Sequence, residues 1–469
     1  MTKWVPNIET SDGPIYQAIA DAIESDIKAG VLAVGDRLPP QRELAYQLGV
    51  TLGTVTRAYT EAERRRLLRG ETGRGTFVAP DGPPISPLLP TENETESLDL
   101  ARNFAYPHLN PNLASGLLRL SRTPGIERLN GFVPSEGLRS HRETGALLFS
   151  FYGLQADPDR VALTCGAQHG IQILLQALFR PGDIVAVDAF TYPSILHSAP
   201  NLGLKPLPIA SSGGGSEGPG AMDAKALASA CRSQSIKGAF LMPNMQNPTT
   251  HTMSLKERQA LVDVAREFDL KLIEDDPYTP FVSERTAAFG ELAPERTASI
   301  ASISKVISPG SRIGFVHVPD RYSGDVRNLI GESTWMASPI TAELISGWVR
   351  DGALEKTVAA KKRANAARFQ LVQECIGETC VYGAPDKVFV WLKVPKSVDP
   401  DILEAGLNAQ GVRILAARHF QAQPQASAPF MRLTLGSISS DDAFEEAVSR
   451  VSRMFDQYRQ ETPRRDPVG

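Results

Sequence analysis

The sequence predicts an α/β protein in two parts: a small N-terminal unit of three helices and a β-hairpin, and a large body in which strands and helices alternate. Three observations lead to this prediction. Apolar residues recur at helical spacing three times within the first 62 residues, β-rich runs alternate with helical stretches from residue 161 onward, and a proline-rich segment separates the two regions. At 469 residues, the chain also exceeds the length of one ordinary domain.

The composition is typical of a soluble globular protein. Hydrophobic residues make up 42% of the chain and charged residues 22%, and no apolar run approaches the length of a membrane-spanning helix. The four cysteines form no CxxC pair and no cluster with histidine, so we expect reduced thiols and no metal site. The first residues lack the apolar core of a signal peptide, and we expect a cytoplasmic protein. With a net charge of −4, any binding to nucleic acid must depend on a local patch.

Residues 80–97 form the predicted linker. Five prolines followed by an acidic, polar run cannot build a packed helix or a central strand. The prolines favour a fairly stiff, extended spacer over a free tether. The linker divides the chain into a head at residues 10–79 and a body at residues 98–460.

In the head, the spacing of apolar residues predicts three helices followed by a hairpin. Thr51 is the expected N-cap of the third helix, and Gly49 supplies the tight turn before it. Two helices joined by a tight turn and followed by a hairpin indicate a winged helix-turn-helix. The predicted elements are a helix from Ile15 to near Gly30, helices at 41–48 and 51–62, and strands at 67–71 and 76–79.

The head carries a local positive patch. Between residues 37 and 80, eight arginines stand against four glutamates, which favours contacts with phosphate. With Val55 and Tyr59 directed inward, the outward face of the third helix carries mostly small and polar residues, as the major groove requires. Arg42 lies at the start of the second helix and Arg74 at the tip of the hairpin, where both can reach DNA.

The head resembles the GntR family of regulators. Six motifs follow the family pattern in order: PIY at 14–16, GDRLP at 35–39, RELA at 42–45, LGVT at 48–51, TVTRAY at 54–59 and GRGTFV at 73–78. The resemblance implies that promoter DNA is a partner. The family usually carries an arginine where this chain has Leu52, so apolar contact with thymine methyl groups is expected to contribute to base readout. The implied DNA-binding residues are Arg42, Thr51, Thr54, Arg57, and Arg74 and Gly75 of the wing.

In the body, β-rich runs and helical stretches alternate in the way typical of an α/β sheet covered by helices. Helical stretches intervene, such as those at 167–179 and 255–268. The predicted strands lie at 161–164, 184–187, 239–242, 271–274, 298–302 and 313–318.

Distinctive side chains follow several of these strands. Lys305 stands in a stretch with no other charge before Arg312, which suits a desolvated amine of lowered pKa, although a lone lysine after a strand is more often a surface residue. Asp275 and Asp276 end another strand. Adjacent carboxylates repel, so the alternatives are an exposed turn or a cation that balances one of them. Gly166 opens a helix whose free N–H groups favour an anion.

These residues match the demands of pyridoxal 5′-phosphate (PLP), which needs an amine, a carboxylate for its pyridine nitrogen, donors for its ring hydroxyl, an aromatic face and an anion site. The region from about residue 100 to 455 resembles a fold-type I PLP-dependent aminotransferase, with a large α/β domain and a smaller α+β domain. The resemblance implies that Lys305 forms a Schiff base with PLP and that Arg432 grips the carboxylate of a substrate or effector. The other implied PLP-binding residues are Asp275 at the pyridine nitrogen, Tyr278 and Asn247 at the ring hydroxyl, Tyr192 against the ring, and Gly166, Ala167, Gln168, Ser302 and Arg312 at the phosphate.

A GntR-like head on such a body resembles the MocR/GabR group of transcription regulators. The first hypothesis is a regulator in which an amine, an amino acid or PLP itself acts at Lys305 and changes how the heads meet DNA. The alternative is a working aminotransferase that carries an auxiliary DNA-binding head, because the same pocket serves both. The resemblance also implies a homodimer in which the head of one subunit rests on the body of the other.

Overall fold

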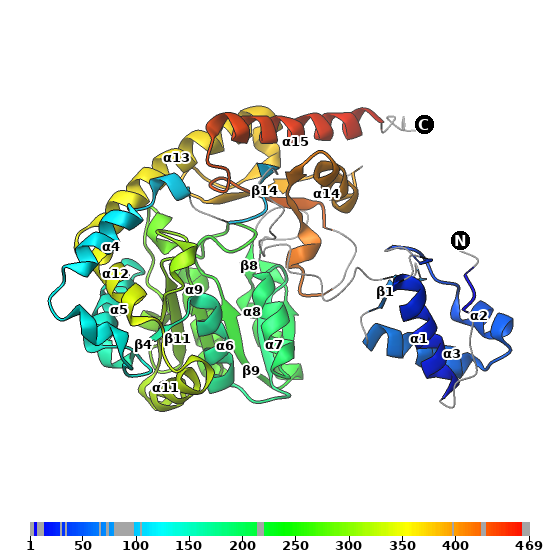
Figure 1. The fold of residues 1–469 in the computed structure, drawn as a ribbon, viewed down its shortest axis with the longest axis horizontal. Coiled ribbons are helices and arrows are strands. Elements are labelled where there is room, and N and C mark those ends of the chain that lie inside the picture. The colour runs from blue at the N-terminus through cyan, green and yellow to red at the C-terminus, as the bar shows by residue number, and fades with distance from the viewer. Residues whose placement is uncertain are drawn as a thin grey trace. The chain divides into compact units, whose positions relative to one another are not determined.

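The computed structural model describes residues 4–6, 14–28, 31–32, 35–64, 67–71, 75–78, 98–103, 106–212, 220–395, 398–423 and 428–461 (Figure 1). The chain divides into two compact units, residues 1–94 and 95–469. The predicted linker at 80–97 lies outside the described residues.

The N-terminal unit is built from three helices and an antiparallel hairpin, which confirms the predicted winged helix-turn-helix. The side chains of Ile23, Val55 and Tyr59 are fully or almost fully buried in its core, whereas Ile15, expected on the apolar face, is 53% exposed. Gly49 ends the second helix in the left-handed conformation, with φ at 64°. The elements are α1 (Ile15–Lys28), α2 (Gln41–Leu48), α3 (Leu52–Arg64), β1 (Leu68–Glu71) and β2 (Gly75–Val78).

The larger unit is built around a seven-stranded sheet in the order β4-β12-β11-β10-β9-β5-β6. All pairs are parallel except those of β12, which runs antiparallel to both of its neighbours. All six predicted strands are present, although β9 begins at Ile236, three residues before its predicted start. The strands are β4 (Val161–Thr164), β5 (Ile184–Asp188), β6 (Lys205–Ile209), β9 (Ile236–Leu241), β10 (Lys271–Asp275), β11 (Thr297–Ser302) and β12 (Gly314–His317).

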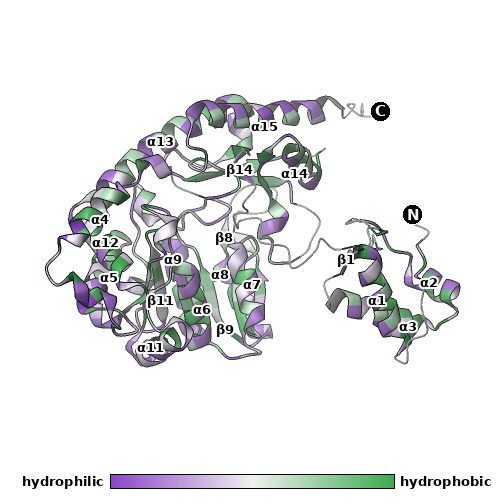
Figure 2. Ribbon diagram, viewed as in Figure 1, coloured by the Kyte–Doolittle hydropathy of each residue, from purple (hydrophilic) through white to green (hydrophobic). Residues whose placement is uncertain are grey.

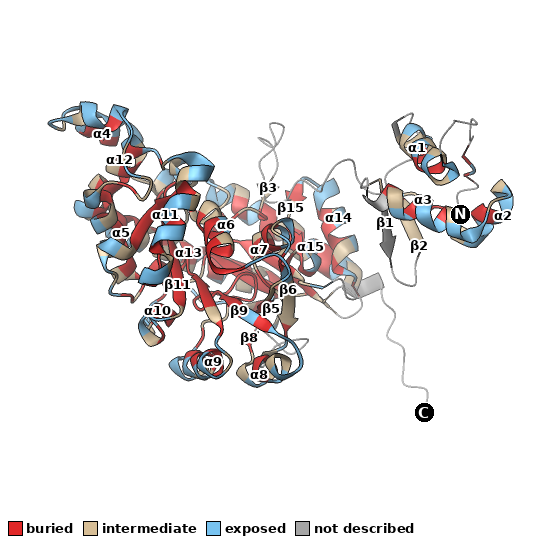
Figure 3. Ribbon diagram, turned by 90° about the horizontal axis from the view of Figure 1, so that it is seen from below, coloured by how far each residue is buried: buried red, intermediate tan, exposed pale blue. Residues whose placement is uncertain are grey.

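Side chains that alternate along these strands face two separate cores. In β9, Phe240 belongs to the core that contains Ile171 and Leu174 of α6, while Leu241 belongs to the core that contains Leu261 of α9. Burial on both faces explains why the strands read as continuous apolar runs. Figure 3 shows the buried strands within their surrounding helices, and the helix residues in Figure 2 alternate between hydrophilic and hydrophobic. These helices are α5 (Arg139–Phe151), α6 (Ala167–Leu178), α7 (Pro193–Asn201), α8 (Ala224–Ser233), α9 (Leu255–Glu267), α10 (Phe289–Leu292) and α11 (Asp320–Thr334).

A smaller α+β part completes the body, as the fold class predicts. Its antiparallel sheet has the order β13-β14-β17-β16, and a separate parallel pair joins β15 to β3 at the start of the unit. Its strands are β3 (Leu98–Asp99), β13 (Val381–Tyr382), β14 (Phe389–Lys393), β15 (Val412–Arg413), β16 (Leu415–Ala416) and β17 (Phe430–Thr434). The remaining long helices are α4 (Leu113–Ser121), α12 (Pro339–Arg350), α13 (Ala353–Ile376), α14 (Pro400–Ala409) and α15 (Asp441–Glu461), and β7 (Ser211–Ser212) pairs with β8 (Ala221–Met222). Among the described helices, none is both long and apolar enough to cross a membrane.

Candidate cofactor pocket and DNA-binding surface

The carboxyl ends of the parallel strands meet at one edge of the large sheet, and the expected pocket residues lie in the turns there. Tyr192 follows β5, Asn247 follows β9 and Lys305 follows β11. Asp275 is the last residue of β10, and Arg312 precedes β12, which is antiparallel and therefore starts at the same edge. In open α/β sheets, ligands bind outside this edge because side chains from several strands converge there.

Lys305 is partly buried, and its amine is directed at the backbone. Nζ donates a hydrogen bond to the carbonyl oxygen of Asn103 at 2.9 Å. Burial and the nearby guanidinium groups of Arg432 and Arg312 lower the pKa of Lys305 to about 8, against the opposing effect of Asp275. A larger fraction of the amine is therefore neutral close to physiological pH than in an ordinary lysine, which favours nucleophilic chemistry at Lys305.

The two adjacent carboxylates differ in their partners. Asp276 Oδ2 accepts a hydrogen bond from Asn244 Nδ2 at 2.6 Å and another from the Thr279 hydroxyl. Asp275 is equally buried, but its Oδ1 has no hydrogen-bond partner among the described residues. Burial first and the Asp276 charge second raise the pKa of Asp275 to about 7. The alternative of an exposed turn is therefore wrong for this pair. Asp275 is the carboxylate with an oxygen left to accept a hydrogen bond from a cationic group.

Hydrogen bonds join the other side of the pocket. Arg432 Nη1 donates to Asn247 Oδ1 at 2.8 Å, and its Nη2 donates to the carbonyl oxygen of Ala101. Arg432 Nε is buried without a partner among the described residues. Asn103 Nδ2 donates to the hydroxyl of Tyr278 at 2.8 Å. Asn103 is not among the predicted site residues, because it belongs to no recognised motif and only the fold brings it to Tyr278.

The N-terminus of α6 forms a cradle beside Arg312. Gly166 has a φ of +84°, and a Cβ atom there would lie 2.5 Å from Nη2 of Arg312. Arg312 Nη2 donates to the carbonyl oxygen of Cys165 at 3.2 Å. The first turn of α6, which begins at Ala167, leaves backbone N–H groups free of helical partners. A positive side chain and free N–H groups at one place suit an anion.

The other predicted PLP-binding residues, Tyr192, Gln168 and Ser302, have different surroundings. Tyr192 lies at the start of α7, and burial first and the Asp275 charge second raise its pKa to about 12. The side chain of Gln168 is held by α7, since its Nε2 donates to Ser198 Oγ at 3.1 Å. The Ser302 hydroxyl donates to Ser304 Oγ at 3.1 Å. The arrangement brings an amine and a carboxylate close enough for each to influence the pKa of the other, and it places Arg312 beside the N-terminus of α6.

The outward face of α3 agrees with the sequence analysis. Leu52, Gly53, Thr56 and Thr60 are exposed, and Thr51 Oγ1 caps the helix by accepting from the Thr54 backbone N–H at 3.2 Å. These residues leave a face on which small and polar side chains meet solvent, as docking in the major groove requires.

Basic and aromatic groups surround this face. The Arg57 guanidinium lies 5.3 Å from the ring centroid of Tyr16, so it is positioned by stacking. Arg42 and Tyr46, one turn apart on α2, are both exposed, Tyr46 by 89%. Tyr46 is not among the residues predicted to bind DNA, although its i, i+4 spacing from Arg42 could have indicated it. In the wing, Gly75 packs close to Arg37, whereas Arg74 lies outside the described residues.

Each of the two units matches a known protein family. Residues 118–451 match the family described as aminotransferase class I and II, and residues 15–78 match the bacterial regulatory proteins of the gntR family. The chain belongs to the aminotransferase class I and II family. Its gntR-type head identifies the architecture as that of the MocR-type transcription regulators, and a DNA-binding role accompanies that head.

Curated relatives share this whole-chain arrangement. The chain is similar to the uncharacterized HTH-type transcriptional regulator YdeF of Bacillus subtilis, with 28% identity over 97% of each chain. It is also similar to the HTH-type pyridoxine biosynthesis transcriptional regulator PdxR of Corynebacterium glutamicum, with 26% identity over 77% of this chain and 78% of that protein. The vitamin B6 salvage pathway transcriptional repressor PtsJ of Salmonella typhimurium is 27% identical over 81% of this chain and 86% of its own.

Solved aminotransferase structures match most of the chain in fold. The α-aminoadipate aminotransferase LysN of Thermus thermophilus superimposes with a TM-score of 0.69 and 21% identity, over 78% of this chain and 94% of LysN. The kynurenine aminotransferase of Pyrococcus horikoshii gives the same TM-score at 20% identity, over 77% of this chain and 91% of its own. These likenesses establish the fold-type I architecture of the regulator's body.

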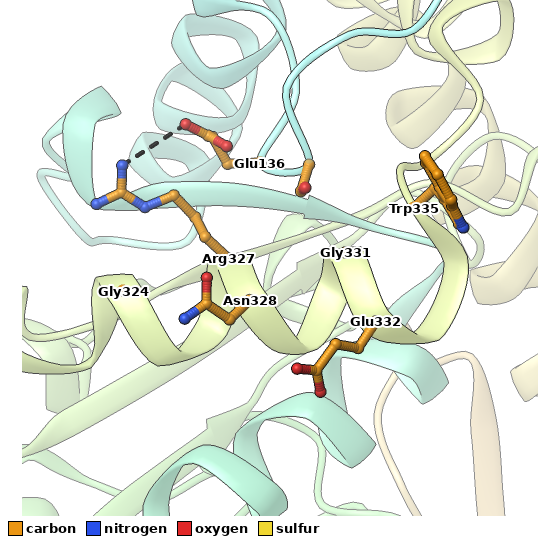
Figure 4. Close-up of a pocket in the computed structure, with 8 residues that line it drawn as sticks. Glu136, Gly324, Arg327, Asn328, Gly331, Glu332 and Trp335 are labelled. Atoms are coloured by element: carbon orange, nitrogen blue, oxygen red, sulfur yellow. Dashed lines mark ion pairs between the residues drawn. The ribbon is translucent and has the colours of Figure 1, made fainter.

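A shallow pocket of this MocR-type body lies along α11. Figure 4 shows Arg327 directed toward Glu136, with Nη1 and Oε1 3.7 Å apart, and Trp335 just after the end of the helix. Trp335 is 69% exposed and its ring centroid lies 5.2 Å from that of Phe132, which is 80% exposed. Two large aromatic rings are therefore open to solvent at this edge of the body.

Proposed function

We propose that this protein is a PLP-responsive transcription regulator of the cytoplasm. In this proposal the head binds promoter DNA, and the body senses an amine, an amino acid or PLP itself at Lys305. The observation that carries the proposal is the combination of a lowered lysine pKa and an unpaired, buried Asp275 Oδ1 in a chain with a gntR-type head. The names of two relatives, which refer to pyridoxine biosynthesis and vitamin B6 salvage, favour a ligand of this chemical class.

The pocket residues fit PLP group by group. Lys305 would attach the cofactor covalently, and Asp275 would accept a hydrogen bond from its protonated pyridine nitrogen, which satisfies the unpaired Oδ1. When bound, PLP supplies an electrophilic imine carbon and an electron sink. The proposed roles of the other residues are ring-hydroxyl contacts by Tyr278 and Asn247, stacking by Tyr192, and phosphate contacts by Arg312, Ser302, Gly166, Ala167 and Gln168.

Arg432 is the proposed anchor for the carboxylate of an amino-acid effector. Its guanidinium is buried, and two of its nitrogens already donate to oxygens of the chain, while Nε has no partner among the described residues. A planar guanidinium with a spare donor suits a carboxylate, and Phe420, whose ring centroid lies 4.8 Å from Cζ, holds it in place.

The alternative function is a working aminotransferase with an auxiliary DNA-binding head. Three proposed site residues favour this enzyme function: a nucleophilic lysine, a carboxylate and an arginine that could bind a substrate carboxylate. Steady production of a keto acid from an amino acid and 2-oxoglutarate would support the enzyme. A ligand-dependent change in DNA binding without such turnover would support the regulator.

We further propose that the protein acts as a homodimer with the heads exchanged between subunits. Apolar side chains exposed on α4 and at the Phe132–Trp335 pair support a partner surface: Leu113, Leu117 and Leu118 are each 46–57% exposed. The linker has 18 residues and is rich in proline, a composition that favours an extended spacer of the kind an exchange needs. Sedimentation of the full chain tests the dimer, since Trp335→Glu should then yield monomers. Cross-linking between head and body in mixed, differently tagged subunits tests the exchange.

The deciding experiment is promoter footprinting with and without PLP and a panel of amino acids. The native protein should change its footprint when PLP or one amino acid is added. Lys305→Ala should lose both this response and the absorbance of covalently bound PLP, while Lys362→Ala, with a lysine on the same unit but outside the pocket, should retain both. If Lys305→Ala leaves the absorbance and the footprint unchanged, the proposed function fails.

A further inference from the structure

The first described part of the body, residues 98–103 and 106–110, lies against the candidate pocket. We call it the entry segment, because it is the first part of the body to follow the linker in sequence. Two of its backbone carbonyl oxygens accept hydrogen bonds from basic side chains of the candidate site. Ala101 accepts from Arg432, and Asn103 accepts from Lys305 at 2.9 Å. The entry segment therefore contacts the two side chains that are expected to react with PLP or hold an effector.

Asn103 makes two contacts with the pocket at once. Its carbonyl oxygen accepts from Lys305 Nζ at 2.9 Å, and its side-chain amide donates to the Tyr278 hydroxyl at 2.8 Å. Asn103 is 8% exposed, so neither hydrogen bond is readily replaced by one to solvent. Both partners belong to turns after strands of the large sheet, β11 and β10.

The same segment is held by the smaller part of the body. The Leu100 backbone N–H donates to the Arg413 carbonyl at 2.8 Å, and the Leu100 carbonyl accepts from the Thr434 N–H at 2.9 Å. Tyr106 N–H donates to the Gly436 carbonyl at 3.0 Å. Asn103 thus connects two parts of the body. Its own segment is hydrogen-bonded to the small sheet, and its partners Lys305 and Tyr278 follow strands of the large sheet.

A further contact joins the other end of the entry segment to the lysine turn. Lys361 Nζ, from α13, donates to Asn110 Oδ1 and to the carbonyl oxygen of Val306, both at 2.6 Å. Val306 is the residue after Lys305. The turn that carries the reactive amine is therefore linked to the entry segment on both sides.

We propose that Asn103 is a positioning residue that transmits the state of Lys305 to the entry segment, and through it to the linker of the DNA-binding head. This inference rests on the proposed function, in which PLP attaches to Lys305. On attachment the aldehyde oxygen leaves as water with two hydrogens of the ammonium group, and one N–H remains at Nζ. The remaining N–H turns to the ring hydroxyl of the cofactor and no longer reaches the Asn103 carbonyl. The Tyr278 hydroxyl moves toward the ring as well, which weakens the hydrogen bond that it accepts from the Asn103 amide. The entry segment is then held less tightly to the large sheet, although the Lys361 contact remains.

Amide hydrogen exchange of the full chain, followed by mass spectrometry, tests this inference with PLP and with pyridoxine 5′-phosphate. The second ligand has an alcohol in place of the aldehyde, so it cannot attach to Lys305. PLP should accelerate exchange in the peptide that covers residues 98–103 by about tenfold, the change expected when a hydrogen bond to a charged group is lost. Pyridoxine 5′-phosphate should produce a much smaller acceleration.

Variants separate the role of Asn103 from general loosening. Asn103→Ala should exchange faster in this peptide before PLP is added and respond less to PLP, and Asn103→Leu, which keeps the volume, should do the same if the alanine variant folds poorly. Asn112→Ala is the matched control, because Asn112 is an exposed helix cap of α4 whose side chain accepts from Ser115 N–H. It should respond to PLP as the native chain does.

The outcomes distinguish this inference from the proposed function. If the absorbance shows that PLP is attached and residues 98–103 exchange at the same rate with and without it, the inference is wrong while PLP binding stands. The inference is also wrong if Asn103→Ala and Asn103→Leu respond to PLP as fully as the native chain. If PLP does not attach to the native chain at all, the proposed function itself fails.

Discussion

Arg432 and Asn247 are joined by a hydrogen bond of 2.8 Å between Nη1 and Oδ1, which links β17 of the small sheet to the turn after β9 of the large sheet. Arg432 is 1% exposed, and burial lowers its pKa to about 10. The contact joins Arg432, the proposed anchor for an effector carboxylate, to Asn247, which is proposed to contact the ring hydroxyl of PLP. An effector held by Arg432 would therefore lie against the same edge as Lys305.

This relationship makes Arg432→Lys informative. Lysine retains the charge but loses the planar, multi-donor geometry of guanidinium, so the affinity for amino-acid effectors should fall about tenfold or more. Affinity for PLP alone should change far less, since Arg432 is not a proposed phosphate contact. Titrating amino acids into the PLP-loaded protein and following its absorbance measures both. An unchanged amino-acid affinity would remove Arg432 from the effector site.

Gly166→Ala tests the anion cradle. A Cβ there would lie 2.5 Å from Arg312 Nη2 and would occupy a residue with φ at +84°, so we expect PLP affinity to fall at least tenfold along with a loss of stability of about 1–3 kcal/mol. Gly182→Ala is the matched control: its φ is +95°, but a Cβ meets nothing within 4 Å. It should lose stability without losing PLP affinity. Equal PLP affinity in the two variants would contradict the cradle.

Much of the pocket could be predicted because its residues follow strands at positions that local sequence reveals. Lys305 and Asn247 each stand in a turn after a strand and Asp275 ends one, and the parallel sheet brings these positions to one edge. Asn103 could not be found in this way, because its role depends on a backbone carbonyl and on pairing between β3 and β15, which are far apart in sequence. The two-residue strands β13 and β15 of the small part were also missed, since strands this short carry almost no periodic signal.

For the head, Arg42→Ala should weaken binding to promoter DNA and reduce the slope of log affinity against log salt by about 1, because one phosphate contact is lost. Arg42 is exposed at the start of α2. Arg453→Ala, an exposed arginine of α15 that pairs with Glu446, is the control and should leave the slope unchanged. Both variants should bind PLP normally. An unaltered slope for Arg42→Ala would place the DNA-binding surface elsewhere on the head.

Asp275 should make the stability of the PLP-free protein depend on pH. Its pKa is raised to about 7 in the folded chain from about 4 when unfolded, so the folded state binds more protons between these values. Its contribution to stability is therefore present at low pH and is lost as pH rises from 4 through 7. Asp275→Asn removes the charge, and at pH 8 it should raise the free energy of unfolding by about 1–3 kcal/mol, with little gain at pH 5.

Asp188 provides the control for this pH dependence. It is buried at the end of β5, and burial raises its pKa to about 7 as well, but we assign it no contact with PLP. Asp188→Asn should thus reproduce the pH-dependent gain in urea denaturation and keep the extra stability that PLP confers. Asp275→Asn should lose that extra stability, because no carboxylate remains to balance the pyridinium. If PLP stabilises both variants equally at pH 8, Asp275 is not the partner of the pyridine nitrogen.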